Sequence, residues 1–284
     1  MSQTRNAGAL VALLTIVTVA GPAEAVDVTD TRLLADPAVS GQHVAFAYAD
    51  DLWLAPRTGG AARRVTSVEG VEAHPAFSPD GRLLAFSAAY DGNTDVYVVP
   101  VEGGQPRRLT WHPGEDLVQE FTPDGRSVAF TSQRAVHTRR HEQLWTVPID
   151  GGMPERVPIP NASRAAISPD GRRIAYNPLG DAFRQWKNYR GGTASRIWIY
   201  DLESQDLAEV PRPPERSNDI EPMWLGDDLY FVSDRAGELN LFRFRSTGGE
   251  VEQLTDHRNF PIVAASSGGG SIVYEQAGWL HLYD

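Results

Sequence analysis

The chain has 284 residues, of which 41% are hydrophobic and 22% charged; it contains no Cys and carries a formal charge of −11 at pH 7. This apolar content is too high for a disordered chain, and the absence of Cys excludes a disulfide scaffold, a thiolate metal site, a cysteine nucleophile and a lipoprotein anchor. The negative charge argues against a general nucleic-acid binder, whose surface is normally basic. The length allows one large domain or two small ones.

Residues 1–25 have the pattern of a secretory signal peptide. Arg5 gives a positive start, Ala7–Ala20 is an apolar run, and Ala23-Glu24-Ala25 is the small-x-small pattern that signal peptidase cleaves. The run has 14 residues, fewer than the about 20 that a membrane span needs, so an uncleaved anchor is the weaker alternative. We therefore expect residues 26–284 to be exported, periplasmic or extracellular, with no membrane segment after cleavage.

After the signal, one pattern recurs along the chain. Its clearest copies are residues 76–110 and 120–157, and further copies begin at residues 39, 166, 223 and 262. Three copies contain a Ser/Thr-Pro-Asp-Gly turn whose prolines, Pro79, Pro123 and Pro169, are 44 and 46 residues apart. Pro presets φ, Asp can bond its own backbone and Gly accepts positive φ, so each turn is suited to joining two strands.

A second kind of turn follows the third strand of most copies. It is marked by the glycine pairs Gly59-Gly60, Gly103-Gly104, Gly151-Gly152 and Gly248-Gly249. Between turns, five- or six-residue segments alternate or run apolar, and helical periodicity is absent. Four short antiparallel strands per repeat of about 43 residues predict an all-β fold: a six-bladed β-propeller over residues 26–284, with the last blade incomplete at the C-terminus.

The sixth copy ends after its third strand. At the other end of the mature chain, Thr31-Arg32-Leu33-Leu34 resembles the fourth strand of the second copy, Arg107-Arg108-Leu109-Thr110. We therefore expect residues 31–34 to pair as the outer strand of blade six and to close the ring. In the alternative, a natural chain that continues beyond Asp284 supplies that strand.

Strand parity predicts where the longer loops lie. In an antiparallel blade, the turns after the first and third strands share one face of the ring, here called the turn face. The loops after the second strand and the crossings between blades share the opposite, loop face. The loop after the second strand is near six residues in the second copy, but spans Gln133–Glu142 in the third and about Pro178–Ser195 in the fourth. Enlarged loops at one end of a rigid scaffold are where binding usually resides.

The two enlarged loops concentrate positive charge. Their cations are Arg134, Arg139 and Arg140 in the first loop, and Arg184, Lys187 and Arg190 in the second. Because the planar guanidinium group can hold both oxygens of a carboxylate, we predict that these six residues bind an anionic group of a substrate. The alternative is that the cations pair with acids of this chain and serve only the fold.

Other motifs in the sequence give weaker evidence of a functional site. His137 and His141 have the spacing of two metal ligands on a helix, but they are expected in a loop without a third ligand, so no metal site is predicted. Residues 91–95 lack most ligands of a calcium loop and are predicted to form a hairpin turn. Neither the Gly-x-Ser-x-Gly elbow nor a phosphate-binding glycine loop occurs in the sequence. We therefore expect no catalytic constellation and no cofactor.

The repeats resemble the TolB-like propeller family, and a narrower likeness is carried by longer phrases. AFAYADDLWLAP, RQWKNYRGGTASRIWIYDLE and EPMWLGDDLYFVSDRAGELNLF are similar to the N-terminal six-bladed propeller of bacterial tricorn proteases. The likeness covers nearly all of residues 31–284, and the RQWKNYRGG insertion is its most specific part.

The resemblance implies a part of a serine peptidase that trims oligopeptides. In such enzymes this propeller precedes a second propeller, a PDZ domain and the catalytic domains, and the propellers are thought to filter and channel peptides. An arginine pair of the first propeller is implicated in holding the peptide's C-terminal carboxylate, and Arg139-Arg140 is the pair at a comparable place. The catalytic elements of such a protease are not expected within these residues.

Three functions follow as hypotheses. The first is a non-catalytic, exported propeller that binds, filters or orients oligopeptides for downstream protease domains. The second is a stand-alone TolB-like periplasmic module that binds a protein partner. The third is a propeller enzyme such as a glycan hydrolase, which would need acids converging on the central channel; Glu120 and Glu221 are the nearest candidates.

Overall fold

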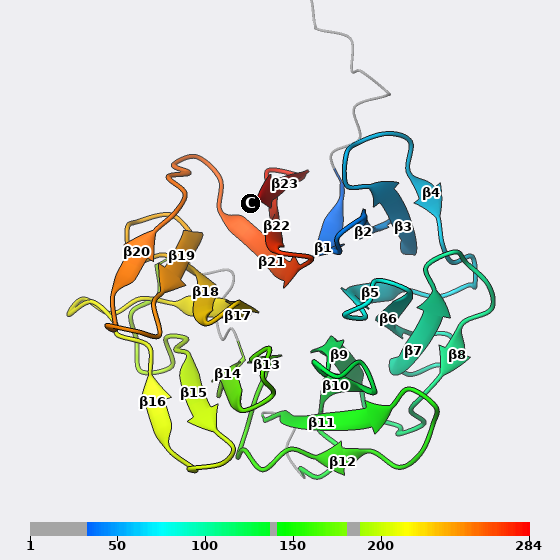
Figure 1. The fold of residues 1–284 in the computed structure, drawn as a ribbon, viewed down its shortest axis with the longest axis horizontal. Helices are drawn as coiled ribbons and strands as arrows, with labels where there is room; N and C mark the ends of the chain where they lie inside the picture. Colours follow the sequence, from blue (N-terminus) through cyan, green and yellow to red (C-terminus); the bar gives the residue numbers. More distant parts are fainter. Residues whose placement is uncertain (1–32, 137–140, 181–187) are drawn as a thin grey trace, which may run out of the picture. The chain divides into compact units, whose positions relative to one another are not determined.

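The chain folds into strands grouped in six separate antiparallel sheets, five of four strands and one of three. The computed structural model describes residues 33–136, 141–180 and 188–284, and within these ranges every regular element is a strand. The six sheets are the blades of a β-propeller, arranged in a ring (Figure 1). The predicted all-β class, the six blades and the incomplete last blade are confirmed.

The strands of the first three blades follow one another in chain order. Blade one contains β1 (Ala35–Val39), β2 (His43–Tyr48), β3 (Asp51–Pro56) and β4 (Arg63–Arg64). Blade two contains β5 (Glu72–Phe77), β6 (Leu83–Ala88), β7 (Asp95–Pro100) and β8 (Arg107–Arg108). Blade three contains β9 (Asp116–Phe121), β10 (Ser127–Ser132), β11 (Gln143–Pro148) and β12 (Glu155–Arg156).

The last three blades repeat the plan, except that the sixth has no fourth strand among the described residues. Blade four contains β13 (Arg164–Ile167), β14 (Arg173–Asn177), β15 (Trp198–Asp201) and β16 (Leu207–Glu209). Blade five contains β17 (Asp219–Leu225), β18 (Asp228–Ser233), β19 (Asn240–Phe244) and β20 (Val251–Gln253). Blade six contains β21 (Ile262–Gly268), β22 (Ser271–Gln276) and β23 (Trp279–Tyr283).

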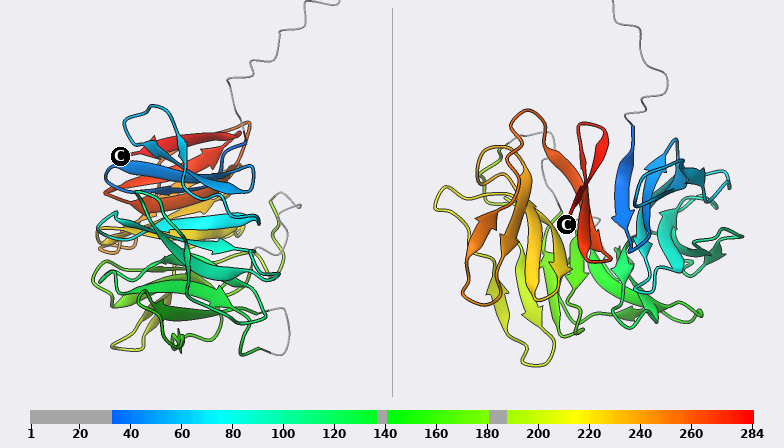
Figure 2. Two further views of the ribbon diagram at one scale, coloured as in Figure 1. Left: turned by 90° about the vertical axis from the view of Figure 1, so that its right-hand side faces the viewer. Right: turned by 45° about the horizontal axis from the view of Figure 1, so that its top comes forward.

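The first strand of every blade is the innermost one, and the strands run between the two faces of the ring (Figures 1 and 2). The hydrophobic core is divided among the seams between neighbouring blades. For example, Leu52 and Leu54 of blade one pack with Leu84 and Phe86 of blade two, and all four are buried. Burial of such a side chain stabilises the fold by about 1.5–3 kcal/mol, so each blade depends on its neighbours.

The Pro-Asp-Gly turns have the predicted structure. In the first, the Ser78 hydroxyl donates to Asp80 at 2.6 Å, and Asp80 accepts the backbone N–H of Arg82 at 3.1 Å. Gly81 has a φ of +69°, which side chains disfavour. These hydrogen bonds lower the pKa of Asp80, and equivalent bonds lower the pKa of Asp124 and of Asp170.

The expected ring closure by residues 31–34 is not found. Leu33 and Leu34 belong to no strand, and Thr31 and Arg32 lie outside the described residues. The reason is geometric: β1 begins at Ala35, which leaves no chain to cross the ~14 Å between an outer fourth strand and an inner first strand. Leu34 instead packs beside a core cluster formed by Val39, Val44, Phe46 and Val273.

Blades six and one meet through close backbone packing and one arginine. A Cβ on Gly268 would lie 2.1 Å from the carbonyl oxygen of Val39, so only glycine fits this approach. Arg57 of blade one donates to the carbonyl of Gly269 at 3.2 Å and also binds the side chains of Ser271 and Asp284. This clasp joins the two blades within the described part of the chain.

Among the described residues there is no helix with the length and apolar character to cross a membrane. The predicted signal peptide, residues 1–25, lies outside the described residues and stays a prediction.

Candidate functional site

The two enlarged loops are on the same face of the ring. One joins β10 to β11 and the other joins β14 to β15, so each follows the second strand of its blade. Because neighbouring strands are antiparallel, both loops lie on the loop face together with the crossings between blades. Four predicted site residues, Arg139, Arg140, Arg184 and Lys187, fall outside the described residues; Arg134 and Arg190 are described.

Arg134 is engaged by an acid of its own blade. Its guanidinium lies 2.5 Å from the carboxylate of Asp116, which is fully buried, and it stacks over Phe130 and Trp145 with centroid distances of 4.8 and 5.2 Å. The side chain of Arg134 is only 12% exposed. This is the structural pairing that the sequence left open as the alternative.

Blade five repeats the arrangement. Arg235 pairs with the buried Asp219 at 2.9 Å and lies over Phe231 and Phe242. Burial raises the pKa of Asp219, while Arg235 acts in the opposite direction. The same pairing of an arginine with a buried aspartate thus occurs in a blade without the enlarged loop. The position of Arg134 is therefore explained by its contacts within the fold.

Arg190 also has a partner in the chain. Its guanidinium donates to Asp234 of blade five at 2.6 Å and to the carbonyl of Tyr189 at 3.1 Å. Asn218 binds both of these residues, its amide donating to Asp234 at 2.8 Å and to the carbonyl of Tyr189 at 2.9 Å. The end of the blade-four loop is therefore attached to blade five.

The centre of the ring holds a cavity of about 1240 Å³ lined by the first strands of all six blades. Three of these strands contain a polar residue with positive φ directly before a proline: Asp36 (φ 47°), His74 (φ 53°) and Glu221 (φ 51°). The pairing register shifts at each of these positions, as in a β-bulge. All three residues line the cavity.

Charged groups of opposite sign meet in this cavity. Arg164 of β13 lies 3.2 Å from Glu221 of β17, and this carboxylate, followed by Asp36, raises the pKa of Arg164. Asp36 also accepts the backbone N–H of His74 at 3.3 Å. Polar contacts therefore link the inner strand of blade one to that of blade two, and the inner strand of blade four to that of blade five.

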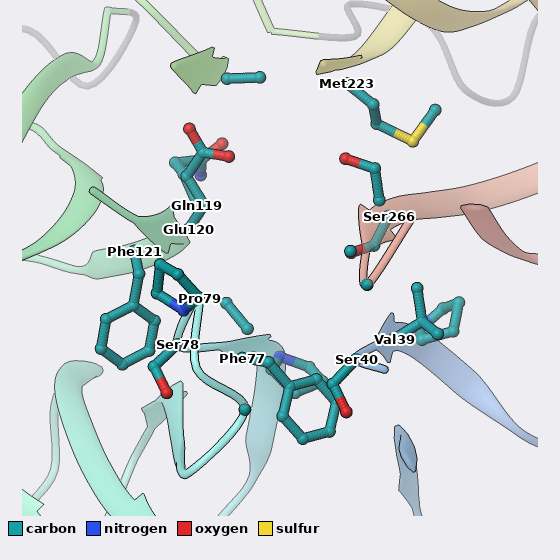
Figure 3. Close-up of a pocket in the computed structure, with 18 of the residues that line it drawn as sticks. Val39, Ser40, Phe77, Ser78, Pro79, Gln119, Glu120, Phe121, Met223 and Ser266 are labelled. Atoms are coloured by element: carbon teal, nitrogen blue, oxygen red, sulfur yellow. The ribbon is translucent and has the colours of Figure 1, made fainter. Parts of the chain in front are cut away.

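Glu120 and Gln119 project from blade three into the same cavity, across from Met223 and Ser266 (Figure 3). Gln119 accepts the backbone N–H of Ala165 at 3.2 Å, and Glu120 accepts that of Ile167, so both side chains bind the exposed edge of β13. Burial raises the pKa of Glu120 to about 8, with the Ile167 hydrogen bond acting in the opposite direction.

The sequence identified Glu120 and Glu221 as channel acids but missed Asp36, His74 and Arg164. The Asp-Pro, His-Pro and Glu-Pro pairs at residues 36, 74 and 221 were the available signal, because a proline within a strand marks a bulge or an edge. Glu221 is bound to Arg164, and Glu120 accepts a backbone N–H, so each acid has a partner within the fold. In the described part of the chain, no cluster of three or more His, Asp or Glu side chains suited to a metal ion occurs.

The fold and the cavity define a six-bladed propeller with a polar central channel and its enlarged loops on one face. Residues 31–284 match the family model described as the tricorn protease N-terminal beta propeller domain. The chain belongs to this family.

Individual relatives agree with this membership. The tricorn protease homolog 1 of Streptomyces coelicolor is 35% identical over 250 residues, which cover 87% of this chain and 23% of the relative. A putative tricorn-like protease N-terminal subunit of Sulfurisphaera tokodaii is 30% identical over 168 residues, covering 58% of this chain and 85% of the relative.

A crystal structure of the tricorn protease superimposes with a TM-score of 0.79 at 23% identity, covering 90% of this chain and 25% of that one. This likeness supports the fold. The chain spans about a quarter of the length of the first-named relative and of this solved structure.

Proposed function

We propose that this propeller is a non-catalytic part of an exported tricorn-type serine peptidase, and that it binds and orients oligopeptides on its loop face. The observation that carries the proposal is that both enlarged loops lie on one face of the ring. The chain belongs to the family of tricorn protease N-terminal propeller domains, which links this face to a protease. Loops collected at one end of a rigid scaffold are where proteins of this architecture can vary their ligands without changing the core.

The chemistry of the loops supports a peptide carboxylate as the group that is held. A protein with a net charge of −11 places six cations in these two segments, and Arg139-Arg140 is the pair best suited to bidentate binding. Arg134 and Arg190 are bound to Asp116 and Asp234, so the proposal rests on Arg139 and Arg140 of the first loop and on Arg184 and Lys187 of the second.

The protein partner follows from the relatives. One of them is named an N-terminal subunit, which supports a propeller that works with protease domains carried elsewhere. The serine nucleophile and the rest of the catalytic machinery are assigned to those domains. The signal-peptide pattern of residues 1–25 supports export, and we propose that the protein acts in the periplasm or outside the cell.

A pair of peptides tests the proposal. A hexapeptide with a free C-terminus is expected to bind about tenfold more tightly than its C-terminal amide, since one charge-assisted interaction worth ~1.4 kcal/mol is lost. Replacing Arg139 and Arg140 together by Ala should abolish this preference, measured by calorimetric titration.

The matched control is the double variant Arg126→Ala with Arg172→Ala. It removes the same charge from exposed positions of two Pro-Asp-Gly turns on the turn face, and should leave the preference intact. Equal affinity of the wild-type protein for acid and amide would refute carboxylate recognition and favour the module that binds a folded protein partner.

A further inference from the structure

The two ends of the central channel differ in chemistry. Each inner strand runs from the loop face to the turn face, and four of them carry a polar or charged lining residue within their first three positions: Asp36, His74, Arg164 and Glu221. Five of the six inner strands finish with an apolar residue that lines the cavity: Val39, Phe77, Phe121, Ile167 and Leu225 (Figure 3). The cavity is therefore polar toward the loop face and apolar toward the turn face.

The polar end holds more negative than positive charge. Arg164 lies 3.2 Å from Glu221, whose charge is the main cause of the raised pKa of this arginine, and Asp36 of blade one acts on it in the same direction. In the described part of the chain, Asp36 has no cation within ion-pair distance and accepts the N–H of His74 at 3.3 Å. Two carboxylates and one guanidinium have a formal charge of −1, so a single further cation would balance them.

We infer that the channel binds the first residue of a peptide, with the α-ammonium group at the polar end and an apolar side chain directed toward the apolar end. This assignment rests on the proposed function, because it takes the opposite end of the peptide whose carboxylate is held on the loop face. An ammonium group supplies one positive charge and three N–H donors, and the carboxylates of Asp36 and Glu221 are acceptors for them.

The distance between the two ends suits a single residue. Arg164 and Ile167 begin and end β13, and three residues of a strand span about 10 Å. An ammonium hydrogen bond of about 2.9 Å and an apolar contact of about 4 Å take up most of this length. The remainder accommodates one side chain, with the peptide continuing from its first residue toward the loop face.

Other occupants fit the channel less well. A metal ion would need more ligands, and the described ranges contain no group of three His, Asp or Glu side chains suited to one. The carboxyl end of a peptide would bring a second negative charge beside Asp36 and Glu221. A polar first side chain would lose its hydrogen bonds to water at the apolar end without finding new ones there.

Four versions of one hexapeptide test the site by calorimetric titration. The peptide begins with Phe, and each end is either free or blocked, by an acetyl group at the amino end and by an amide at the carboxyl end. Acetylation should weaken binding about tenfold whichever carboxyl end is present, because a charge-assisted interaction is lost. Ser in place of the first Phe should also weaken binding about tenfold, because the buried aromatic surface is lost.

A conservative variant connects the effect to the channel. Asp36→Asn retains an oxygen that can accept the His74 N–H but removes one negative charge. It should reduce the effect of acetylation to less than about threefold and leave the effect of the C-terminal amide unchanged. The matched control is Asp150→Asn, which removes the same charge from an exposed glycine-pair turn and should leave both effects unchanged.

A photoreactive phenylalanine as the first residue locates the side chain and should label residues 164–167 and 221–225. Equal affinity of free and acetylated peptides, an acetylation effect that Asp36→Asn does not reduce, or labelling confined to residues 133–142 would overturn the inference. If the amide weakens binding and acetylation does not, carboxylate recognition stands and the channel site is refuted. If acetylation weakens binding and the amide does not, the channel site stands and carboxylate recognition is refuted.

Discussion

Two seams of the ring are built in different ways. Between blades three and four, side chains span the gap, since Gln119 and Glu120 accept backbone N–H groups of β13. Between blades six and one, the backbones themselves touch at Gly268 and Val39, and Arg57 clasps the end of the last blade. The first arrangement places an ionisable side chain, Glu120, across the seam, whereas the second relies on backbone contact and the arginine.

Within the described residues, blades six and one meet without an exchanged strand. A glycine that admits direct contact, a small apolar cluster and one arginine join these two blades. Three changes test how far the two seams differ.

The largest effect is expected from pH at the seam between blades three and four. Since the pKa of Glu120 is raised from 4.5 to about 8, the native state keeps a proton that the unfolded chain loses. The free energy of unfolding should therefore fall by about 2–4 kcal/mol as pH rises from 4.5 to 8, and level off above that. Urea denaturation across this range, compared with Glu120→Gln, measures the difference; parallel curves for the two proteins would show that Glu120 does not titrate in this way.

The seam between blades six and one should respond to a single added methyl group. Gly268→Ala places a Cβ against the backbone carbonyl of Val39, which no side-chain rotation can relieve, and should destabilise the protein by about 1–3 kcal/mol. Gly192→Ala is the matched control because no atom lies within 4 Å of its Cβ position and its φ is not in the left-handed region. Similar denaturation midpoints for the two variants would mean that the close approach contributes nothing to closure.

Arg57→Ala should have the smallest effect on global stability. The arginine is partly exposed and its partner Asp284 is mostly exposed, so the denaturation midpoint should fall by only about 1–2 °C. Hydrogen exchange in β23 should nevertheless accelerate, because the clasp holds the end of this strand. Arg258→Ala, which removes an exposed ion pair in the crossing before blade six, serves as the control and should leave β23 unchanged.

The sequence predicted the parts of the fold that depend on local chemistry. The Pro-Asp-Gly turns and the glycine pairs specify φ within four residues, and the repeat spacing then gives the number of blades. Parity of antiparallel strands was enough to assign the enlarged loops to one face. These inferences need no knowledge of which distant residues meet.

The parts that were missed depend on contacts between distant segments. Arg57 and Asp284 are 227 residues apart, and nothing in either local sequence marks the clasp. The pairing of Arg134 with Asp116 was only one of two alternatives in the sequence. An arginine that forms an ion pair within the fold cannot be told from one that binds a ligand by its local sequence. The proposed closure by residues 31–34 failed because pattern matching ignored the chain length needed to cross a blade.

The central claim, that the loop face holds the C-terminal end of a peptide, is tested most directly by photo-crosslinking. A peptide with a free C-terminus and a photoreactive phenylalanine as its second-last residue should label residues 133–142, with less labelling after Arg139→Ala with Arg140→Ala. Adducts confined to the Pro-Asp-Gly turns at residues 78–82, 122–126 and 168–172, on the opposite face, would contradict the account.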